Sequence, residues 1–251
     1  MGQRLGQHFL AATSILKRIA EAACAPGEPL VVEIGPGKGA LTEHLLARAQ
    51  RVAAIELDPA LVGALHSRFP SHPKLTLIQG DALRIALDQW GPATFAGNLP
   101  YYAATPIIER VVRLHPTVRG AVFLIQKEVA ERLVAVPGTR QYGYLTVATR
   151  LFADARILFD VRPGAFQPPP KVDSSVIRLV PRNRIEELRL PDADAFLRFL
   201  QQCFRQKRKT LRNNLGPIYG KDALEKLPES SQRAEQVTLD RFAAIYLGLV
   251  G

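Results

Sequence analysis

Short apolar runs alternate with stretches of helical spacing over most of the chain. The runs have the length of strands, and several end directly in glycine, acidic or amide residues. The predicted strands cover residues 30–34, 51–57, 75–80, 93–97, 121–126, 155–161 and 175–180. Apolar residues at helical spacing occur at 40–49, 127–136 and 144–152. This alternation predicts an α/β fold with a doubly wound, mostly parallel, seven-stranded sheet.

The pattern changes after Pro181, where strands give way to helices alone. Helical spacing recurs at 193–205, 207–215, 221–227 and 239–249. We therefore predict a sheet-containing domain of residues 1–182 and a smaller, all-helical domain of residues 183–251. With 251 residues, of which 47% are hydrophobic, the chain is long enough for both.

A glycine-rich turn follows the first predicted strand. It reads Gly35-Pro36-Gly37-Lys38-Gly39 and leads into a predicted helix. Glycines at alternate positions let the backbone approach a ligand closely, and the helix N-terminus presents unpaired N–H groups. Gly35, Gly37 and Ala40 also fit a loose dinucleotide fingerprint, with Glu56 where a ribose-binding acid is expected. At this point a nicotinamide enzyme remains a competing interpretation.

Carboxylates follow the next two strands. Glu56 and Asp58 end one strand, and Asp81-Ala82 follow the other. In a parallel sheet such ends face one crevice, where Glu56 could accept from both ribose hydroxyls and Asp81 from an adenine amino group. Each acid alone could instead be a solvated loop residue or cap a helix, an alternative that is weaker for Glu56 and Asp81 than for Asp58. Four strand ends in order favour S-adenosylmethionine over a nicotinamide.

The fourth strand ends in Asn98-Leu99-Pro100-Tyr101, which suits a planar base with an amino group. Such an amine is a poor nucleophile because its lone pair is delocalised into the ring. Acceptance of both N–H groups by the Asn98 side-chain oxygen and a backbone carbonyl would favour a nitrogen whose lone pair is available. Tyr101 could stack on the base. Alone, these four residues could be an ordinary turn, but the upstream strand ends make the base-binding interpretation the better one.

Taken together, these motifs resemble the ribosomal RNA adenine-N6,N6-dimethyltransferases. The resemblance rests on residues 32–37, 55–58, 80–82 and 98–101, and it extends to 6–10, 166–174 and 205–213. It covers nearly the whole chain. Two departures from the family pattern are Tyr102-Ala103-Ala104, where the family usually has Asn-Ile-Ser, and Ala12, where it usually has an acid.

The resemblance implies a Rossmann-like methyltransferase that uses S-adenosylmethionine. The product would be N6,N6-dimethyladenosine at two adjacent adenosines in a loop near the 3′ end of small-subunit (16S) ribosomal RNA. The cofactor-binding residues would be His8, Leu10, Gly35, Gly37, Glu56, Asp81, Ala82 and Asn98. The catalytic group would be Asn98, Leu99, Pro100, Tyr101 and Phe166. The chemistry requires no metal and no dedicated general base.

Phe166 lies on a proline-rich loop, where an aromatic ring is costly to order unless it packs against something. One interpretation is that it fills the gap between the sheet and the helical domain. The other, supported by the resemblance, is that it closes the base pocket opposite Tyr101. We prefer the second.

Charge points to a polyanionic partner. The formal net charge is +10, and Arg205, Lys207, Arg208, Lys209 and Arg212 lie within eight residues that contain no acid. On a helix these cations would suit a phosphate backbone, although a solvated helix face is the usual explanation of such a run. The resemblance implies small-subunit ribosomal RNA, or an assembly intermediate of the small subunit, as the partner of a monomeric protein.

The remaining composition excludes several classes of protein. Cys24 and Cys203 are far apart, so neither a disulfide framework nor a zinc site is predicted. The sequence shows no signal peptide and no apolar run of membrane-spanning length, so we expect a cytoplasmic protein with no membrane partner.

Two rival functions stay open. One is a large-subunit ribosomal RNA adenine methyltransferase of the macrolide-resistance type, against which the triple proline at 168–170 and the segment 205–213 argue. The other is a non-catalytic RNA-binding or assembly factor, against which Glu56 and an intact 98–101 motif argue.

Overall fold

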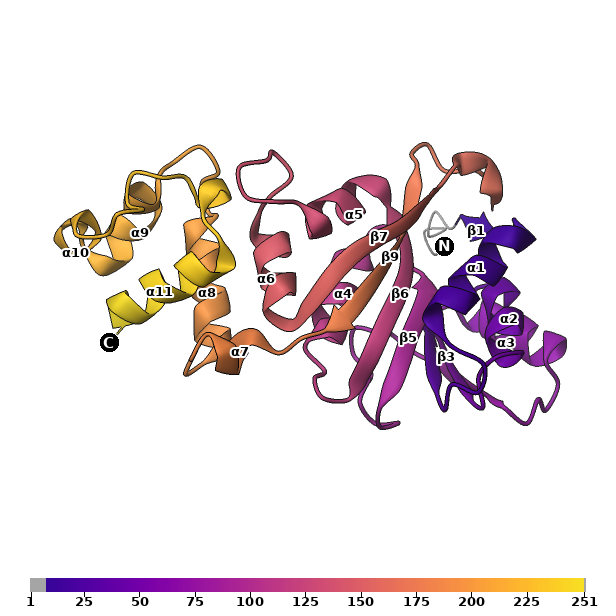
Figure 1. Cartoon of the computed structure of the whole chain (residues 1–251). Helices are drawn as coiled ribbons and strands as arrows, with labels where there is room; N and C mark the ends of the chain where they lie inside the picture. The colour runs from indigo at the N-terminus through magenta and orange to yellow at the C-terminus, as the bar shows by residue number, and fades with distance from the viewer. Residues whose placement is uncertain (1–7, 251) are drawn as a thin grey trace. The chain divides into compact units, whose positions relative to one another are not determined.

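The computed structural model of the protein describes residues 8–250. Its first part is built on a seven-stranded sheet with the strand order β4-β3-β2-β5-β6-β9-β7. Figure 1 labels β3, β5, β6, β9 and β7 of this sheet. The strands are β2 (Val31–Ile34), β3 (Val52–Glu56), β4 (Leu75–Gln79), β5 (Ala93–Asn98), β6 (Val118–Gln126), β7 (Ala153–Val161) and β9 (Ser174–Pro181). The strands from β4 through β3, β2 and β5 to β6 are parallel to one another, and β9 is antiparallel to β6. The predicted α/β class and mostly parallel seven-stranded sheet are confirmed.

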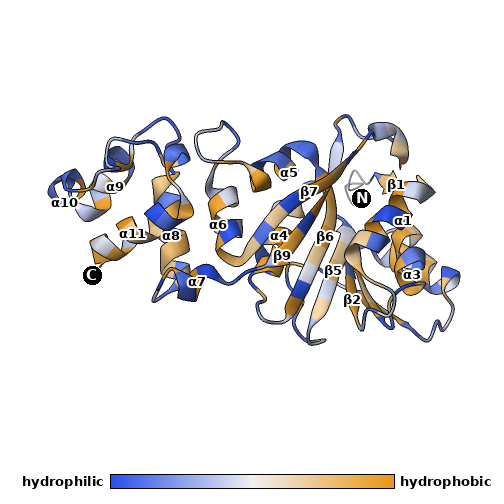
Figure 2. Cartoon of the chain, viewed as in Figure 1, coloured by the Kyte–Doolittle hydropathy of each residue, from blue (hydrophilic) through white to orange (hydrophobic). Residues whose placement is uncertain are grey.

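Helices between the strands complete this part of the molecule. They are α1 (Thr13–Ala23), α2 (Ala40–Leu46), α3 (Pro59–Arg68), α4 (Ala104–Val112) and the first half of α5 (Lys127–Val134), whose second half belongs to the helical unit. Helix α1 packs against α2 and three strands, and α4 packs against β6. Leu16 and Ile19 of α1 join Leu45 of α2 and Val122 of β6 in one buried cluster. Hydrophobic residues accordingly concentrate in the strands and along parts of these helices (Figure 2).

The central strands approach one another closely where they end. All four residues of β2 are buried, as expected for a parallel strand covered on both faces. A Cβ atom at Gly97 of β5 would lie 2.3 Å from the Ile34 carbonyl oxygen, so only glycine fits there. This approach brings the turn after β2 beside Asn98, the last residue of β5.

A second, two-stranded sheet was not predicted. β1 (Phe9–Leu10) pairs antiparallel with β8 (Phe166–Gln167), so segments about 157 residues apart lie side by side. The backbone N–H groups of Ala11 and Ala12 both donate to the Ala165 carbonyl oxygen. The proline-rich loop is thereby tied to the start of the described chain. Gly6 and Gln7, which belong to the first quoted motif, lie outside the described residues.

The chain forms two compact units. The first comprises residues up to 130 together with 155–181, and the second comprises 131–154 together with the chain from 182 onward. The second unit contains α6 (Tyr144–Phe152), α7 (Arg184–Glu187), α8 (Ala193–Cys203), α9 (Leu211–Tyr219), α10 (Lys221–Glu225) and α11 (Leu239–Val250). The sequence-based boundary at 182/183 left residues 131–154 with the sheet, whereas contacts group them with the helices.

Packing explains why residues 131–154 join the helical unit. Tyr142 is fully buried, and its hydroxyl donates to the Val237 carbonyl oxygen at 2.8 Å. Helix α6 packs against α7, α8 and α11. The core of this unit is aromatic, with the rings of Phe196 and Phe199 each 5.4 Å from that of Tyr246. In residues 8–250, no helix has the length and apolar character needed to cross a membrane.

The prediction of a basic helix is wrong for most of its residues. Helix α8 ends at Cys203 and α9 begins at Leu211, so residues 204–210 form an exposed turn. Buried Asn214 determines this shape, because its Nδ2 donates to the carbonyl oxygens of Cys203 and Gln206 while its Oδ1 accepts from the Gln206 N–H. The spacing of apolar residues could not reveal such a side-chain clamp, which competes with helical hydrogen bonding.

Candidate active site

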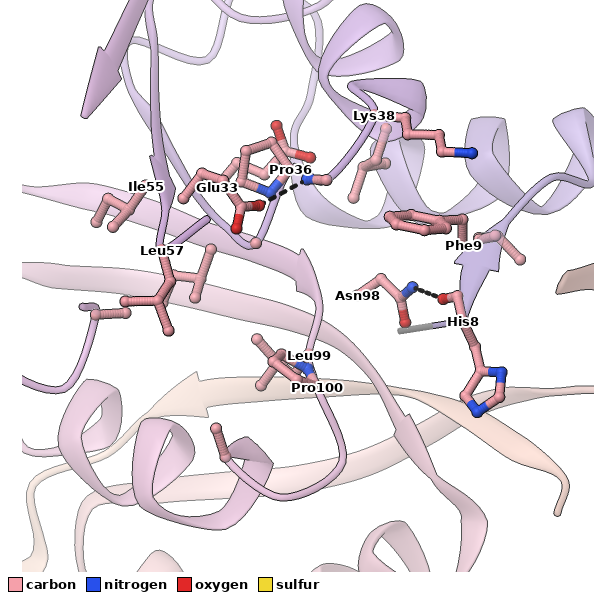
Figure 3. A pocket seen from close by; sticks show the side chains of 18 of the residues that line it. His8, Phe9, Glu33, Pro36, Lys38, Ile55, Leu57, Asn98, Leu99 and Pro100 are labelled. Atoms are coloured by element: carbon pink, nitrogen blue, oxygen red, sulfur yellow. Dashed lines mark hydrogen bonds between the residues drawn. The ribbon is translucent and has the colours of Figure 1, made fainter. Parts of the chain in front are cut away.

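A cavity of about 390 Å³ opens at the carboxyl ends of the central strands (Figure 3). Its wall is drawn mainly from residues 8–11, 33–38, 55–57, 80–83 and 98–103. Each of the four strand ends singled out in the sequence therefore contributes to one space, as expected for the crevice of a doubly wound sheet. Of the predicted site residues, the following line it: His8, Leu10, Gly35, Gly37, Glu56, Asp81, Ala82, Asn98, Leu99, Pro100 and Tyr101.

Glu56 is held rigidly at the end of β3. Only 4% of the residue is exposed. Its Oε2 accepts from the Gly37 N–H and its Oε1 from the Asp58 N–H, both at 3.0 Å. Gly37 has φ +57°, and a Cβ atom there would lie 3.0 Å from Cε1 of Phe9. The glycine turn is thus fitted between this carboxylate and the N-terminal strand, and the free lone pairs of the carboxylate can accept from ligand hydroxyls.

The Asp58 side chain caps a helix and is not directed at the cavity by a pair of backbone N–H groups as Glu56 is. Its side-chain Oδ1 accepts from the Ala60 N–H at 2.8 Å, and Pro59 occupies the first helical position of α3. The alternative that Asp58 caps a helix is therefore what the structure shows.

A second buried carboxyl, Glu33, lies in the cavity wall and was not among the predicted site residues. It is 1% exposed, and Thr42 Oγ1 donates to its Oε2 at 2.6 Å. Burial raises the pKa of Glu33 to about 8, the Thr42 hydrogen bond opposes this rise, and the nearby charge of Glu56 adds to it. Glu33 is therefore mostly neutral at pH 7, so the cavity holds the charge of Glu56 beside an uncharged carboxyl. The sequence feature that could have identified Glu33 as a site residue is its position as the one acid inside an otherwise apolar strand.

Asn98 is oriented by the N-terminal strand. Its Nδ2 donates to the backbone carbonyl oxygen of His8 at 3.0 Å, as Figure 3 shows. Because the amide nitrogen is engaged there, Oδ1 is directed away from His8 and can accept a hydrogen bond from a ligand. The next residue, Leu99, is anchored by its N–H, which donates to the Leu124 carbonyl oxygen.

The Tyr101 side chain is held through its hydroxyl and through its ring. Its hydroxyl is hydrogen-bonded to Oγ of buried Ser174 at 2.9 Å, and its ring centroid lies 5.9 Å from that of His8. His8 is itself held, since its Nδ1 donates to the Pro168 carbonyl oxygen at 2.9 Å. Burial raises the pKa of the Tyr101 phenol, and the Ser174 hydrogen bond opposes the rise, so the hydroxyl stays neutral at pH 7. The ring is a preorganised flat surface.

The wall after β4 combines an acid with apolar side chains. Asp81 Oδ1 accepts from the Leu83 N–H at 2.9 Å, and the Ala82 carbonyl oxygen accepts from Arg110 at 2.8 Å. Leu57 and Leu83 line the same cavity and are 46% and 39% exposed. Exposed leucines in a cavity offer contact to an apolar ligand face, and the sequence analysis did not identify these two.

Phe166 lies elsewhere. It is 5% exposed, pairs with Leu10 across the β1–β8 ladder, and packs in the buried cluster that includes Leu16. Its neighbour Gln167 lines the cavity instead. Since successive side chains of a strand point to opposite sides, this alternation turns the Phe166 ring into the core. Phe166 is therefore a core residue of the first unit that does not line the cavity, and stacking of its ring on a base opposite Tyr101 stays a prediction.

The predicted RNA-binding cations gather in the helical unit. Arg205, Lys207, Arg208 and Lys209 are exposed on the turn between α8 and α9, whereas Arg212 lies in α9 with an ion pair to Glu225 at 3.3 Å. Lys207 Nζ donates to the backbone carbonyl oxygen of Arg140 at 2.7 Å. The exposed Arg140 was missed because it is distant in sequence. Among residues 8–250, no group of three or more potential metal-binding side chains is found.

Comparison with known proteins gives consistent relatives. Residues 2–247 match the family described as ribosomal RNA adenine dimethylase. The chain is similar to ribosomal RNA small subunit methyltransferase A of Acidobacterium capsulatum, with 42% identity over 97% of this chain and 89% of that protein. It also resembles the crystal structure of a dimethyladenosine transferase from Plasmodium falciparum, with 28% identity, a TM-score of 0.82 and 96% of each chain covered. The 23S rRNA methyltransferase ErmE follows with 26% identity, a TM-score of 0.73, and 97% and 100% covered.

Proposed function

The chain belongs to the ribosomal RNA adenine dimethylase family, and we propose that its cavity transfers methyl groups from S-adenosylmethionine to N6 of adenines in small-subunit ribosomal RNA. The product is N6,N6-dimethyladenosine. The observation that carries this proposal is the orientation of Asn98, whose Nδ2 is engaged by His8 so that Oδ1 remains as an acceptor in the cavity. An acceptor, rather than a donor, is what an amino group to be methylated requires.

The cavity fits the cofactor on the geometry of its own residues. Glu56 is held by two backbone N–H groups, and its remaining lone pairs would accept from the ribose hydroxyls. Gly35 and Gly37 line the cavity with backbone that carries no side chain, so a ligand can approach the chain closely there. Asp81 lines the same cavity and would accept from the adenine amino group, and His8, Leu10 and Ala82, which also line it, would complete the predicted contacts. S-adenosylmethionine supplies an electrophilic methyl group when bound.

At the target base, the residues of the 98–101 motif provide orientation. In the first transfer, Asn98 Oδ1 and the Leu99 carbonyl oxygen would accept from the two amino hydrogens, which favours a nitrogen with its lone pair directed at the methyl group. In the second transfer a single hydrogen remains, and one of these acceptors would hold it. Pro100 restricts the turn, and Tyr101 holds the base plane. S-adenosylmethionine held in the cavity would supply the methyl group to this nitrogen and would leave as the neutral thioether S-adenosylhomocysteine. The methylated nitrogen, now cationic, would lose a proton to water. Positioning of this kind can lower a barrier by up to ~7–11 kcal/mol.

The RNA itself is larger than the cavity, and we assign its phosphates to residues 204–210 between α8 and α9, which we call the basic turn. Arg205, Arg208 and Lys209 project from that turn, with Lys207 and Arg212 beside them. The target adenosine leaves its stack to enter the cavity. We propose that two adjacent adenosines in a loop near the 3′ end of the RNA are the targets. The protein would act as a monomer on an assembling small subunit in the cytoplasm.

The small subunit is preferred to the large subunit because the similarity to a small-subunit enzyme, at 42% identity, exceeds the 26% identity to ErmE. The test is incubation of the protein with labelled S-adenosylmethionine and either unmethylated small or unmethylated large subunits, followed by mapping of the labelled nucleotide. Label on adenine N6 of the small subunit is expected. Label confined to the large subunit would favour the macrolide-resistance type, and no label on either would favour a non-catalytic factor.

A further inference from the structure

Two consecutive tyrosines follow Pro100, and their surroundings differ. Tyr101 is half-buried and anchored through Ser174. Tyr102 also lines the cavity but is 63% exposed. Among residues 8–250, the Tyr102 ring makes no ring contact and its hydroxyl has no hydrogen-bond partner. A large aromatic side chain left open at the rim of a cavity is a candidate contact for a ligand that extends beyond the cavity.

The ribosomal RNA of the proposed function is a ligand that extends beyond the cavity. The inference drawn below rests on that proposed function. When a base leaves its stack and enters a cavity, the neighbouring base loses the partner on one face. An exposed aromatic ring at the cavity mouth can cover that face, as stacking platforms do for single-stranded nucleic acids. The other aromatic rings among the described residues that line the cavity are those of His8, Phe9 and Tyr101, and none of these residues is exposed. The His8 ring lies beside Tyr101, and the Phe9 ring lies at Gly37 with Lys38 Nζ 4.7 Å from its centroid, so Tyr102 is the one left open.

We propose that Tyr102 stacks on the base adjoining the adenosine held in the cavity. Tyr101 then contacts the base that reacts, and Tyr102 contacts its neighbour. Because the two target adenosines are adjacent, each becomes the neighbour while the other reacts. Stacking of this kind is present before and during methyl transfer, so it lowers the KM for the RNA without changing kcat.

The test compares Tyr102→Ala, Tyr102→Leu and Tyr102→Phe in steady-state methylation of unmethylated small subunits. Tyr102→Ala should raise the KM for the subunit about tenfold with kcat unchanged. A tenfold change corresponds to ~1.4 kcal/mol, which lies within the ~1–3 kcal/mol that stacking contributes per base. Tyr102→Phe should behave as the wild type, because the aromatic face is kept. Tyr102→Leu should resemble the alanine variant. Calorimetry should give the same S-adenosylmethionine affinity for all.

Val180→Ala is a matched control, since Val180 is another exposed apolar residue, at 44%, that does not line the cavity. A wild-type KM in Tyr102→Ala would overturn this inference and leave the proposed function standing. A wild-type KM in Tyr102→Leu would overturn the stacking role, because leucine supplies apolar area without a ring. Failure of the wild-type protein to methylate small subunits would overturn the proposed function and this inference with it.

Discussion

The cavity and the basic turn are both polar, but their groups are held in different ways. In the cavity, Glu56 and Asn98 are each fixed by hydrogen bonds to backbone groups. On the turn, the side chains of Arg205, Arg208 and Lys209 are exposed. The backbone at the start of the turn is held by hydrogen bonds from the Asn214 side chain. Methyl transfer depends on atoms placed to a fraction of an ångström, whereas attraction to phosphates depends on the number and sign of charges. Preorganisation is therefore concentrated where bonds change.

The most severe way to break the rigid region is Phe166→Ala. Removing a ring that is 5% exposed should destabilise the protein by ~3–5 kcal/mol, because a cavity forms under the β1–β8 pairing. Urea denaturation measures this loss, and Phe166→Leu should lose less. If stability held while transfer fell, the ring would act as the base-stacking residue of the original prediction.

Asn98→Ala should have the next largest effect. It removes the acceptor for the amino group, and loss of one preorganised polar partner of a transition state reduces kcat by about 10²–10³-fold. Single-turnover methylation of small subunits measures the rate, and a thermal melt controls for folding. A rate within threefold of the wild type would remove Asn98 from the proposed mechanism.

Glu56→Ala tests the other rigid group. Loss of a charged acceptor should weaken S-adenosylmethionine binding by ~1.5–3 kcal/mol, as measured by calorimetry. Asp58→Ala is the matched control. It removes a neighbouring carboxylate that caps α3, so it should reduce stability by ~0.5–2 kcal/mol and leave cofactor affinity unchanged. Equal affinities in Glu56→Ala and the wild type would contradict the ribose assignment.

Loss of cations from the basic turn should weaken binding to the small subunit in proportion to the number of phosphate contacts removed. Replacing Lys207, Arg208 and Lys209 by Gln should weaken binding to the small subunit most at low salt, with each lost contact reducing the slope of log affinity against log salt by ~0.7–0.9. Because Lys207 donates to the Arg140 carbonyl oxygen, we expect a loss nearer to two contacts than three.

S-adenosylmethionine affinity should not change in this triple variant. Lys17→Gln, an exposed cation on α1, serves as the control. Parallel salt slopes for the wild type and the triple variant, with equal affinities, would remove the turn from the RNA-binding surface.

The smallest effect at pH 7 is expected for Glu33→Gln, since burial raises the pKa of Glu33 to about 8 and the carboxyl is already mostly neutral. The folded protein keeps a proton that the unfolded chain releases near its ordinary pKa of 4.5. The associated stability is complete below that value and is lost as the pH rises through about 8. Urea denaturation from pH 5 to 9 should show this loss in the wild type and not in Glu33→Gln. Parallel curves would contradict the raised pKa.

Local patterns in the sequence determined the order of strands along the chain and the residues at their ends. Strand-length apolar runs predicted the seven strands of the sheet, because burial on both faces requires continuous apolar residues. The residues after four of them were assigned to one crevice, because parallel strands bring their carboxyl ends to one edge. Gly35, Glu56, Asp81 and Asn98 were placed at the cavity by this reasoning alone.

Tertiary structure decided the features that depend on partners distant in sequence. Phe166 faces the core because β8 pairs with β1, and residues 204–210 form a turn because Asn214 clamps them. Arg140 lies at the basic turn because Lys207 binds its carbonyl oxygen. Glu33 is neutral because the fold buries it beside Glu56. Side-chain hydrogen bonds and desolvation depend on neighbours in space, and the spacing of apolar residues carries no information about them.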